Sequence, residues 1–233
     1  MPGFPTTSWS LVIAAAGPSK DALESLCRTY WRPVYVFVRA QGNGLEESKD
    51  LTQAFFARLL EKNYLAAADR ERGKFRSFLL TSVKNFLANE RDRAHALKRG
   101  GPQLALSIDS AENEDWCTPE VIDRSTPESL FERRWALALL ERAMSNLRAG
   151  YAGNGKLKQF EQLSVFLDDD STEGRYDAVA AQMGVTAGAV RIAVHRLRRK
   201  HREFLRNEIA NTVSEPNQID DELRFLLSAL SAE

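Results

Sequence analysis

Basic side chains recur on one face of a predicted helix in the last quarter of the sequence. Seven of the sixteen residues in 191–206 are Lys or Arg. The side chains that share the face are Arg191, His195, Arg196 and Arg199. Residues three or four positions apart meet on a helix surface, and arginines placed there can reach phosphates and guanine edges in a major groove. The pattern predicts binding of a polyanion. An ordinary helical hairpin with a solvated basic face is the alternative.

The residues before this basic face have the order of a helix, a tight turn and a capped helix. Residues 176–183 predict a short helix, Gly184 the turn and Thr186 the N-cap of the next helix. The second helix is expected to bury Val190, Val194 and Leu197. Together they predict a helix-turn-helix, in which Thr186 and Gly188 lie at a helix N-terminus that offers N–H groups to a phosphate.

Residue patterns for catalysis or metal binding are weak. Cys27 and Cys117 form no CxxC pair, and the three histidines show no HxxxH or HExxH spacing. The acidic run 168–170 is interpreted as a solvated helix end, and the glycine cluster 150–155 lacks the Lys-Ser/Thr ending of a phosphate-binding loop. We expect no enzyme activity, no metal and no cofactor.

The formal net charge of zero conceals charged blocks. The chain has 233 residues, with 32 Lys and Arg against 32 Asp and Glu. Residues 1–99 carry net +6, residues 100–132 net −7, residues 175–206 net +6 and residues 207–233 net −5. Two basic blocks separated by an acidic one predict two modules that face polyanions, joined by a solvated connector. Chance clustering of surface charge is the alternative.

No apolar run approaches the roughly 20 residues of a membrane span. The short apolar run 11–16 has no basic residue before it, so a signal peptide is poorly supported. A cytoplasmic, reducing location without a membrane partner is expected.

Apolar residues recur at helical spacing through most of the chain, which predicts an all-α protein. Residues 21–40 are expected to form two helices separated at Pro33, and Thr126 and Pro127 to begin a helix that ends near Arg148. The predicted domains are two small helical domains at 1–99 and 129–211, an acidic linker at 100–128 and an acidic helical tail at 212–233.

The helix-turn-helix resembles a known family. Residues 176–199 read YDAVAAQMGVTAGAVRIAVHRLRR. The segment is similar to the region-four helix-turn-helix of bacterial RNA polymerase sigma factors of the extracytoplasmic-function type.

Two upstream segments resemble region two of the same family. Residues 50–60, DLTQAFFARLL, are similar to its polymerase clamp-binding helix. Residues 75–89, FRSFLLTSVKNFLAN, are similar to its promoter-melting helix. The resemblance covers roughly residues 20–99 and 130–206, and it implies a sigma factor that binds core RNA polymerase and directs promoter recognition and transcription initiation without a cofactor.

The resemblance also implies three sets of contact residues. Contacts with polymerase are expected from Asp50, Gln53, Phe56, Arg58 and Leu60, although Phe56 and Leu60 could be core residues alone. Contacts with the melted downstream promoter element are expected from Arg72, Lys74, Arg76, Lys84, Asn85, Asn89, Arg91 and Arg93. Contacts with the upstream promoter element are expected from Thr186, Gly188, Arg191, His195, Arg196 and Arg199.

Several features depart from the family pattern. Ala54 and Ala187 stand where glutamate is usual, an extra helix is predicted at 156–167, and the acidic tail carries apolar residues that suit a docking helix. Promoter DNA and core polymerase are the expected partners, with an anti-sigma protein as a further candidate, and the free chain is expected to be a monomer. The alternatives are a stand-alone helix-turn-helix regulator, and an enzyme or helical adaptor whose basic helix is incidental.

Overall fold

The computed structural model describes residues 20–60, 73–97, 125–167 and 174–231. Helices and turns make up these ranges, and no strand occurs within them, so the predicted all-α class is confirmed. Residues 100–124, most of the predicted linker, lie outside the described residues. Within the described ranges, no helix combines the length and the apolarity needed to cross a bilayer.

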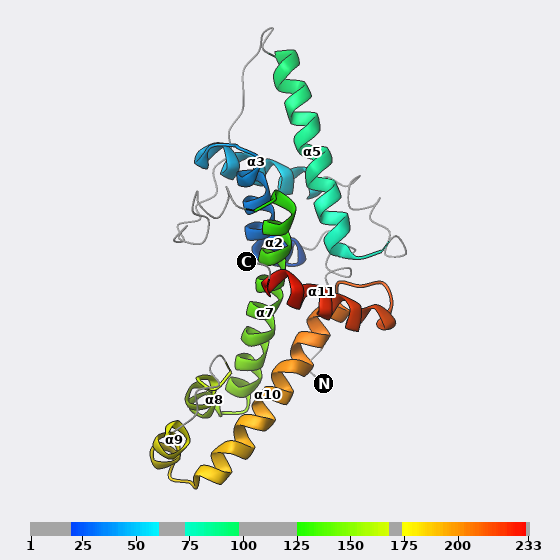
Figure 1. Ribbon diagram of the computed structural model, residues 1–233. Coiled ribbons are helices and arrows are strands. Elements are labelled where there is room, and N and C mark those ends of the chain that lie inside the picture. The colour runs from blue at the N-terminus through cyan, green and yellow to red at the C-terminus, as the bar shows by residue number, and fades with distance from the viewer. Residues whose placement is uncertain (1–19, 61–72, 98–124, 168–173, 232–233) are drawn as a thin grey trace. The chain divides into compact units, whose positions relative to one another are not determined.

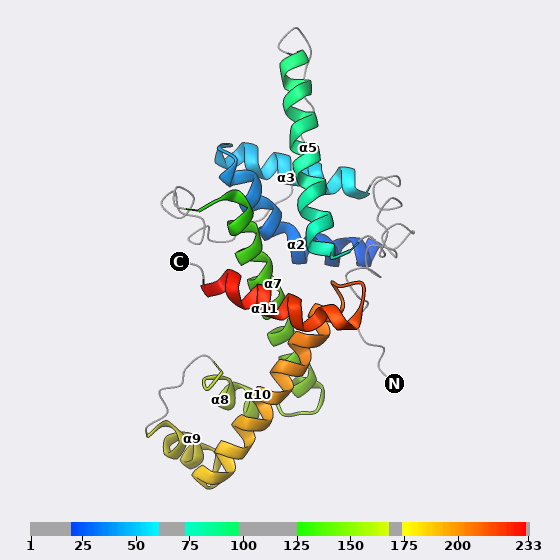
Figure 2. The same ribbon diagram turned by 45° about the vertical axis from the view of Figure 1, so that its right-hand side comes forward.

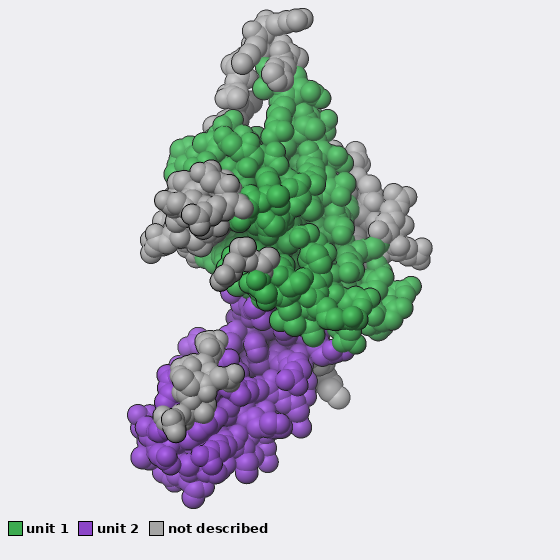
Figure 3. All heavy atoms as spheres, in the orientation of Figure 1, with its two compact units in different colours: residues 1–138, 209–233 green, residues 139–208 purple. Residues whose placement is uncertain are grey.

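The chain divides into two compact units, one formed by residues 1–138 and 209–233 and the other by residues 139–208 (Figure 3). These boundaries differ from those of the predicted domains. The start of the helix at residue 127 and the C-terminal segment both belong to the first unit, because their side chains pack with its helices. The two units are described separately below.

The first unit is built from helices of both ends of the sequence (Figures 1 and 2). Its described elements are α2 (Lys20–Ala40), α3 (Leu45–Leu60), α5 (Phe75–Leu97), the start of α7 (Pro127–Gly153), the short 3₁₀ helix η2 (Pro216–Gln218) and α11 (Ile219–Ser231).

Helix α2 runs without interruption through Pro33, so the prediction of two helices was wrong. A proline inside a helix removes one hydrogen bond and crowds the preceding turn. Here fully buried residues lie both before and after it along the helix, among them Tyr30, Val34 and Phe37. The burial of these apolar side chains along one continuous helix outweighs the loss of a single hydrogen bond.

Trp135 of α7 lies at the centre of the first unit's core and is fully buried. Its ring stacks on Tyr30 of α2 at a centroid distance of 4.5 Å and lies 5.8 Å from Phe75 of α5. Helix α7 begins as predicted, because the Oγ1 of Thr126 accepts a hydrogen bond from the N–H of Ser129 at 3.1 Å. The cap fixes the start of α7, and two turns later Trp135 of the same helix contacts α2 and α5.

The second unit contains the end of α7, α8 (Leu157–Ser164), α9 (Arg175–Met183) and most of α10 (Ala187–Ala210). Its buried core consists of Leu147, Phe160, Leu163, Phe166, Ala180, Val190, Val194 and Leu197. All four helices contribute to this core, and Phe166 comes from the turn after α8, so the apolar side of α10 packs against the other three helices.

The position of Trp135 generates a stability prediction. Trp135→Ala should lower the free energy of unfolding by about 3–5 kcal/mol, because it removes a large buried ring and leaves a cavity. Urea unfolding followed by circular dichroism measures this. The control Leu227→Ala removes a side chain of the same unit that is 54% exposed and should change stability by less than about 0.5 kcal/mol. Equal losses for both variants would contradict the central place of Trp135.

Candidate nucleic-acid interface

The turn between α9 and α10 is set by two residues. Gly184 has φ = +67°, a left-handed conformation that residues with a β-carbon rarely adopt. The Oγ1 of Thr186 then accepts a hydrogen bond from the N–H of Ala189 at 3.2 Å, so Thr186 is the predicted N-cap of α10. A short turn and a capped start therefore fix the direction of α10 relative to α9 within this unit.

Helix α10 has two chemically different sides. Val190, Val194 and Leu197 are buried, as predicted from their spacing. The opposite side is exposed and carries the predicted upstream-element residues Thr186, Gly188, Arg191, His195, Arg196 and Arg199. The structure thus brings this set together on one solvent-facing surface, which we call the α10 face.

Arg191 is oriented by an aromatic stack. Its Cζ lies 5.4 Å from the centroid of the Tyr176 ring, and that ring stacks on Phe166 at 4.6 Å with an interplanar angle of 5°. A guanidinium over an aromatic face is attracted by the ring quadrupole. Because Phe166 is buried, the stack connects an exposed cation to the core of the unit and restricts where its guanidinium can point.

A cavity of about 210 Å³ adjoins the α10 face. Three cationic side chains, Lys156, Arg196 and Lys200, line it, together with the polar side chains of Asn154 and Gln159. None of the described residues that line it is acidic. The sequence analysis missed Lys156 and Lys200, although Lys200 follows Arg196 by four residues and so shares its side of the helix.

On α5 the predicted residues fall into two groups, an exposed set from the middle of the helix onwards and a paired set at its start. Asn85, Asn89 and Arg93 are exposed and lie on one helix side at intervals of four residues. Arg93 forms an ion pair with Glu90 at 2.7 Å. Arg91, also exposed, donates a hydrogen bond to the Oε1 of Gln41 at 3.0 Å.

Lys84 forms an ion pair with Glu128 in the first turn of α7. Its Nζ is 2.8 Å from the Oε1 of Glu128, and both side chains remain partly exposed. The hydrogen bond from Lys84 lowers the pKa of the Glu128 carboxyl below its usual value. Lys84 therefore has an intramolecular partner, but an exposed ion pair of this kind contributes little and exchanges readily.

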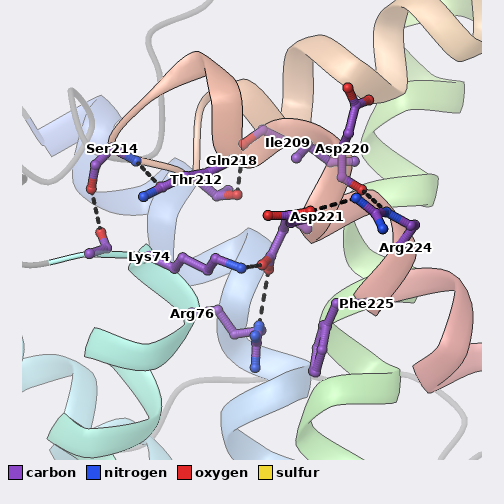
Figure 4. A network of polar contacts seen from close by, with 12 residues as sticks. Lys74, Arg76, Ile209, Thr212, Ser214, Gln218, Asp220, Asp221, Arg224 and Phe225 are labelled. Atoms are coloured by element: carbon purple, nitrogen blue, oxygen red, sulfur yellow. Dashed lines mark hydrogen bonds and ion pairs between the residues drawn. The ribbon is translucent and has the colours of Figure 1, made fainter.

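The first turn of α5 differs most from its predicted role (Figure 4). Arg76 is only 8% exposed, so the expectation that it lies on a solvent-facing surface was wrong. Its Nε donates to Glu222 at 3.1 Å, its Nη1 donates to Glu132 at 2.9 Å, and its Cζ lies 3.8 Å from the centroid of the Phe225 ring. Two carboxylates and an aromatic ring thus occupy the guanidinium that was expected to meet DNA.

Lys74 shares one of these carboxylates. Its Nζ lies 2.7 Å from the Oε2 of Glu222, whose side chain is 1% exposed. Arg72, the remaining member of the predicted set, lies outside the described residues.

On α3 the predicted polymerase contacts are divided between surface and core. Asp50 is exposed and Gln53 is partly exposed, three residues apart on one side of the helix. Phe56 is 3% exposed and stacks on Trp31 at 5.9 Å, so it is a core residue rather than a surface contact. Arg58 lies 3.5 Å from Glu90 of α5, and the side chain of Leu60 lies outside what the structure describes.

In the part of the chain that the structure describes, no group of three or more His, Cys, Asp or Glu side chains could hold a metal ion. Burial raises the pKa of the Cys27 thiol to about 11, so this cysteine carries its proton at neutral pH. Reactive cysteine nucleophiles have a lowered pKa instead, so the raised pKa of Cys27 is typical of a structural thiol.

No protein-family model matches the sequence, and neither a curated protein nor a solved structure matches the chain. The assignment of function therefore depends on the geometry described above and on the sequence motifs.

The raised pKa of Cys27 predicts slow thiol chemistry. The folded pKa lies above the ordinary thiol value of 9.0, so at pH 8 the thiolate fraction should be roughly 100-fold smaller in the folded chain than in the unfolded one. In a Cys117→Ser variant, labelling by a disulfide reagent at pH 8 should be slow in buffer and fast in urea, and the rate in buffer should rise until about pH 11. Equal rates in the two conditions would contradict the burial of this thiol.

Proposed function

We propose that the chain is an RNA polymerase sigma factor, which binds core polymerase and directs promoter recognition and transcription initiation. The observation that carries the proposal is the two-sided α10. One side is apolar and buried, and the other exposes Arg191, His195, Arg196 and Arg199 directly after a tight turn and a capped helix start. That surface suits a DNA major groove, because arginine pairs with phosphates and with the O6 and N7 of guanine.

The first unit supplies the second part of the proposal. Asp50 and Gln53 on α3 would bind the polymerase, in line with the resemblance of residues 50–60 to the clamp-binding helix. Asn85, Asn89 and Arg93 would bind the melted strand, since exposed amide and guanidinium groups along one helix side can follow a sugar–phosphate backbone and read unstacked bases.

A stand-alone DNA-binding regulator is the second candidate, and a specific observation favours it. Phe56 and Arg76, two residues that the sigma-factor reading assigns to polymerase and to DNA, are both buried. A regulator would need only the α10 face. Binding to core polymerase separates the two functions.

Asp50→Ala with Gln53→Ala should weaken binding to core polymerase by about tenfold or more, since each lost hydrogen bond to a charged partner is worth about 1.5–3 kcal/mol. Biolayer interferometry with immobilised core polymerase measures the affinity, and circular dichroism checks the helical content. Glu46→Ala is the matched control, because Glu46 is an exposed acid of the same helix that pairs only with its neighbour Lys49 at 3.4 Å among the contacts described here. Undiminished affinity in a folded double variant would contradict the assignment of the contact to Asp50 and Gln53. No affinity in the wild type would exclude this function and favour the regulator.

A further inference from the structure

We propose that the cavity beside the α10 face binds a phosphate of the DNA backbone, which makes Lys156 and Lys200 DNA-contacting residues. This inference rests on the proposed function, because it extends the surface that binds the upstream promoter element. The residues concerned lie outside the motif from which that surface was predicted.

The charge of the lining is the first argument. Lys156, Arg196 and Lys200 gather around one cavity, and no described acidic residue lines it. Like charges that share a concave surface repel one another, and the repulsion is relieved when an anion enters. Lys200 is held by an aromatic contact, with its Nζ 5.2 Å from the centroid of the Tyr151 ring, rather than by a carboxylate among the contacts described here.

The backbone adds to this field. Helix α8 begins directly after Lys156, and no side chain forms a hydrogen bond that caps its first N–H groups. Uncapped N–H groups at a helix start carry partial positive charge and can donate hydrogen bonds to an anion. The contribution has the same sign as that of the three cations.

The size and position of the cavity identify the anion. A volume of about 210 Å³ is below the roughly 300–1,000 Å³ of pockets that enclose drug-sized ligands, so it suits one group of a larger molecule. Arg196 lines the cavity and also belongs to the α10 face. A duplex on that face would therefore present its backbone to the same residue and to the cavity behind it.

Duplex binding by the full chain at several salt concentrations tests the proposal. Lys156→Ala with Lys200→Ala should reduce the slope of log affinity against log salt by about 1–2 and weaken binding to all sequences alike. Lys158→Ala is the control, because Lys158 is an exposed lysine of α8 that does not line the cavity. Arg191→Ala should instead weaken binding to the preferred sequence by about 5- to 150-fold more than binding to other sequences.

The outcomes distinguish this proposal from the proposed function. If Arg191→Ala has its expected effect and the double lysine variant keeps the wild-type slope, the phosphate site is overturned and the function stands. If the wild type binds no duplex, both fail. Titration with pyrophosphate at constant ionic strength covers the other source of phosphate: tight binding of pyrophosphate that the double variant loses, with its duplex slope unchanged, would assign the cavity to a free ligand and overturn the DNA contact.

A separate observation in the first unit carries a second proposal. We propose that the segment 209–231 is an intramolecular cover, which competes with a nucleic-acid strand for the first turn of α5. The carboxylate of Glu222 forms ion pairs with both Lys74 and Arg76, at 2.7 Å and 3.1 Å. A carboxylate and a phosphate are alternative partners for the same cations.

The cover also forms hydrogen bonds with backbone groups at and just before the start of α5. The N–H of Phe75 donates to the carbonyl of Thr212 at 2.9 Å, and the Oγ of Ser214 donates to the carbonyl of Gly73 at 2.9 Å. The segment thus occupies the start of α5 through side chains and main chain together (Figure 4). Residues 209–231 carry four acids and one base, so the cover has the same sign of charge as the strand that it would exclude.

Release of the cover is measured on the wild type and on one pair of variants. Binding of a single-stranded oligonucleotide should speed hydrogen exchange of the amides in 219–231. Glu222→Gln should bind the oligonucleotide about fivefold tighter or more than both the wild type and Asp221→Asn, because a neutral amide pairs less strongly with Lys74 and Arg76 and leaves them to the phosphates. Asp221 is an exposed acid of the same helix, so its variant makes the same change in charge.

Two results would overturn the cover. One is that the oligonucleotide binds the wild type without any change in the hydrogen exchange of residues 219–231, while Asn89→Ala and Arg93→Ala weaken its binding and so locate it on α5. The other is equal affinity of Glu222→Gln and Asp221→Asn. Absence of single-strand binding in every variant would instead count against the proposed melting role itself, and with it the cover.

Discussion

A carboxylate that is withdrawn from water must meet cations, and in the first unit Glu222 meets two. Glu222 is fully buried, and the side chains of Lys74 and Arg76 at the start of α5 form ion pairs with its carboxylate. Removing one partner from a buried ion pair costs several kcal/mol, because the remaining charge stays desolvated. The C-terminal segment is therefore bound to α5 by a constraint that its apolar residues alone would not impose. The same constraint withdraws Arg76 from the solvent and recruits Glu132 as its second carboxylate.

The second unit depends on a different principle, the separation of two roles on one helix. The apolar side of α10 packs against three other helices, so its opposite side can concentrate positive charge without loss of the core. Carboxylates are placed at the far end of the same helix, where Glu208 accepts a hydrogen bond from Asn146 at 2.7 Å and pairs with Arg142 at 2.9 Å. Acidic contacts thus stabilise the end of α10 that follows the basic face. On the face itself Arg199 pairs with Glu203 at 3.5 Å, and both side chains remain exposed.

Local features of this fold could be predicted from the sequence, and features set by distant contacts could not. Thr126, Thr186 and Gly184 act within a few residues of themselves, and each was predicted correctly. The continuity of α2 through Pro33 could not be predicted, because packing along both halves of the helix decides it.

The same distinction explains the candidate site. The spacing of residues 191–199 predicted the exposed side of α10, but the exposure of Arg76 depends on a partner 146 positions away. A signal for that partner was present in the sequence. Glu222 lies between Ile219 and Leu226 on the apolar stripe of its helix, and an acid at such a position predicts a buried cation. The proximity of Lys156 to Lys200 had no comparable signal, since it depends on how α8 packs beside α10.

We propose that this chain directs core RNA polymerase to its promoters. The most direct test of this proposal is transcription by purified core RNA polymerase over a library of random upstream sequences. The reaction is run with and without the full chain, and the transcripts are sequenced. The account predicts chain-dependent transcripts whose templates share two short elements, one upstream and one next to the start site. Transcripts that are the same with and without the chain, although the chain binds duplex DNA, would contradict the account.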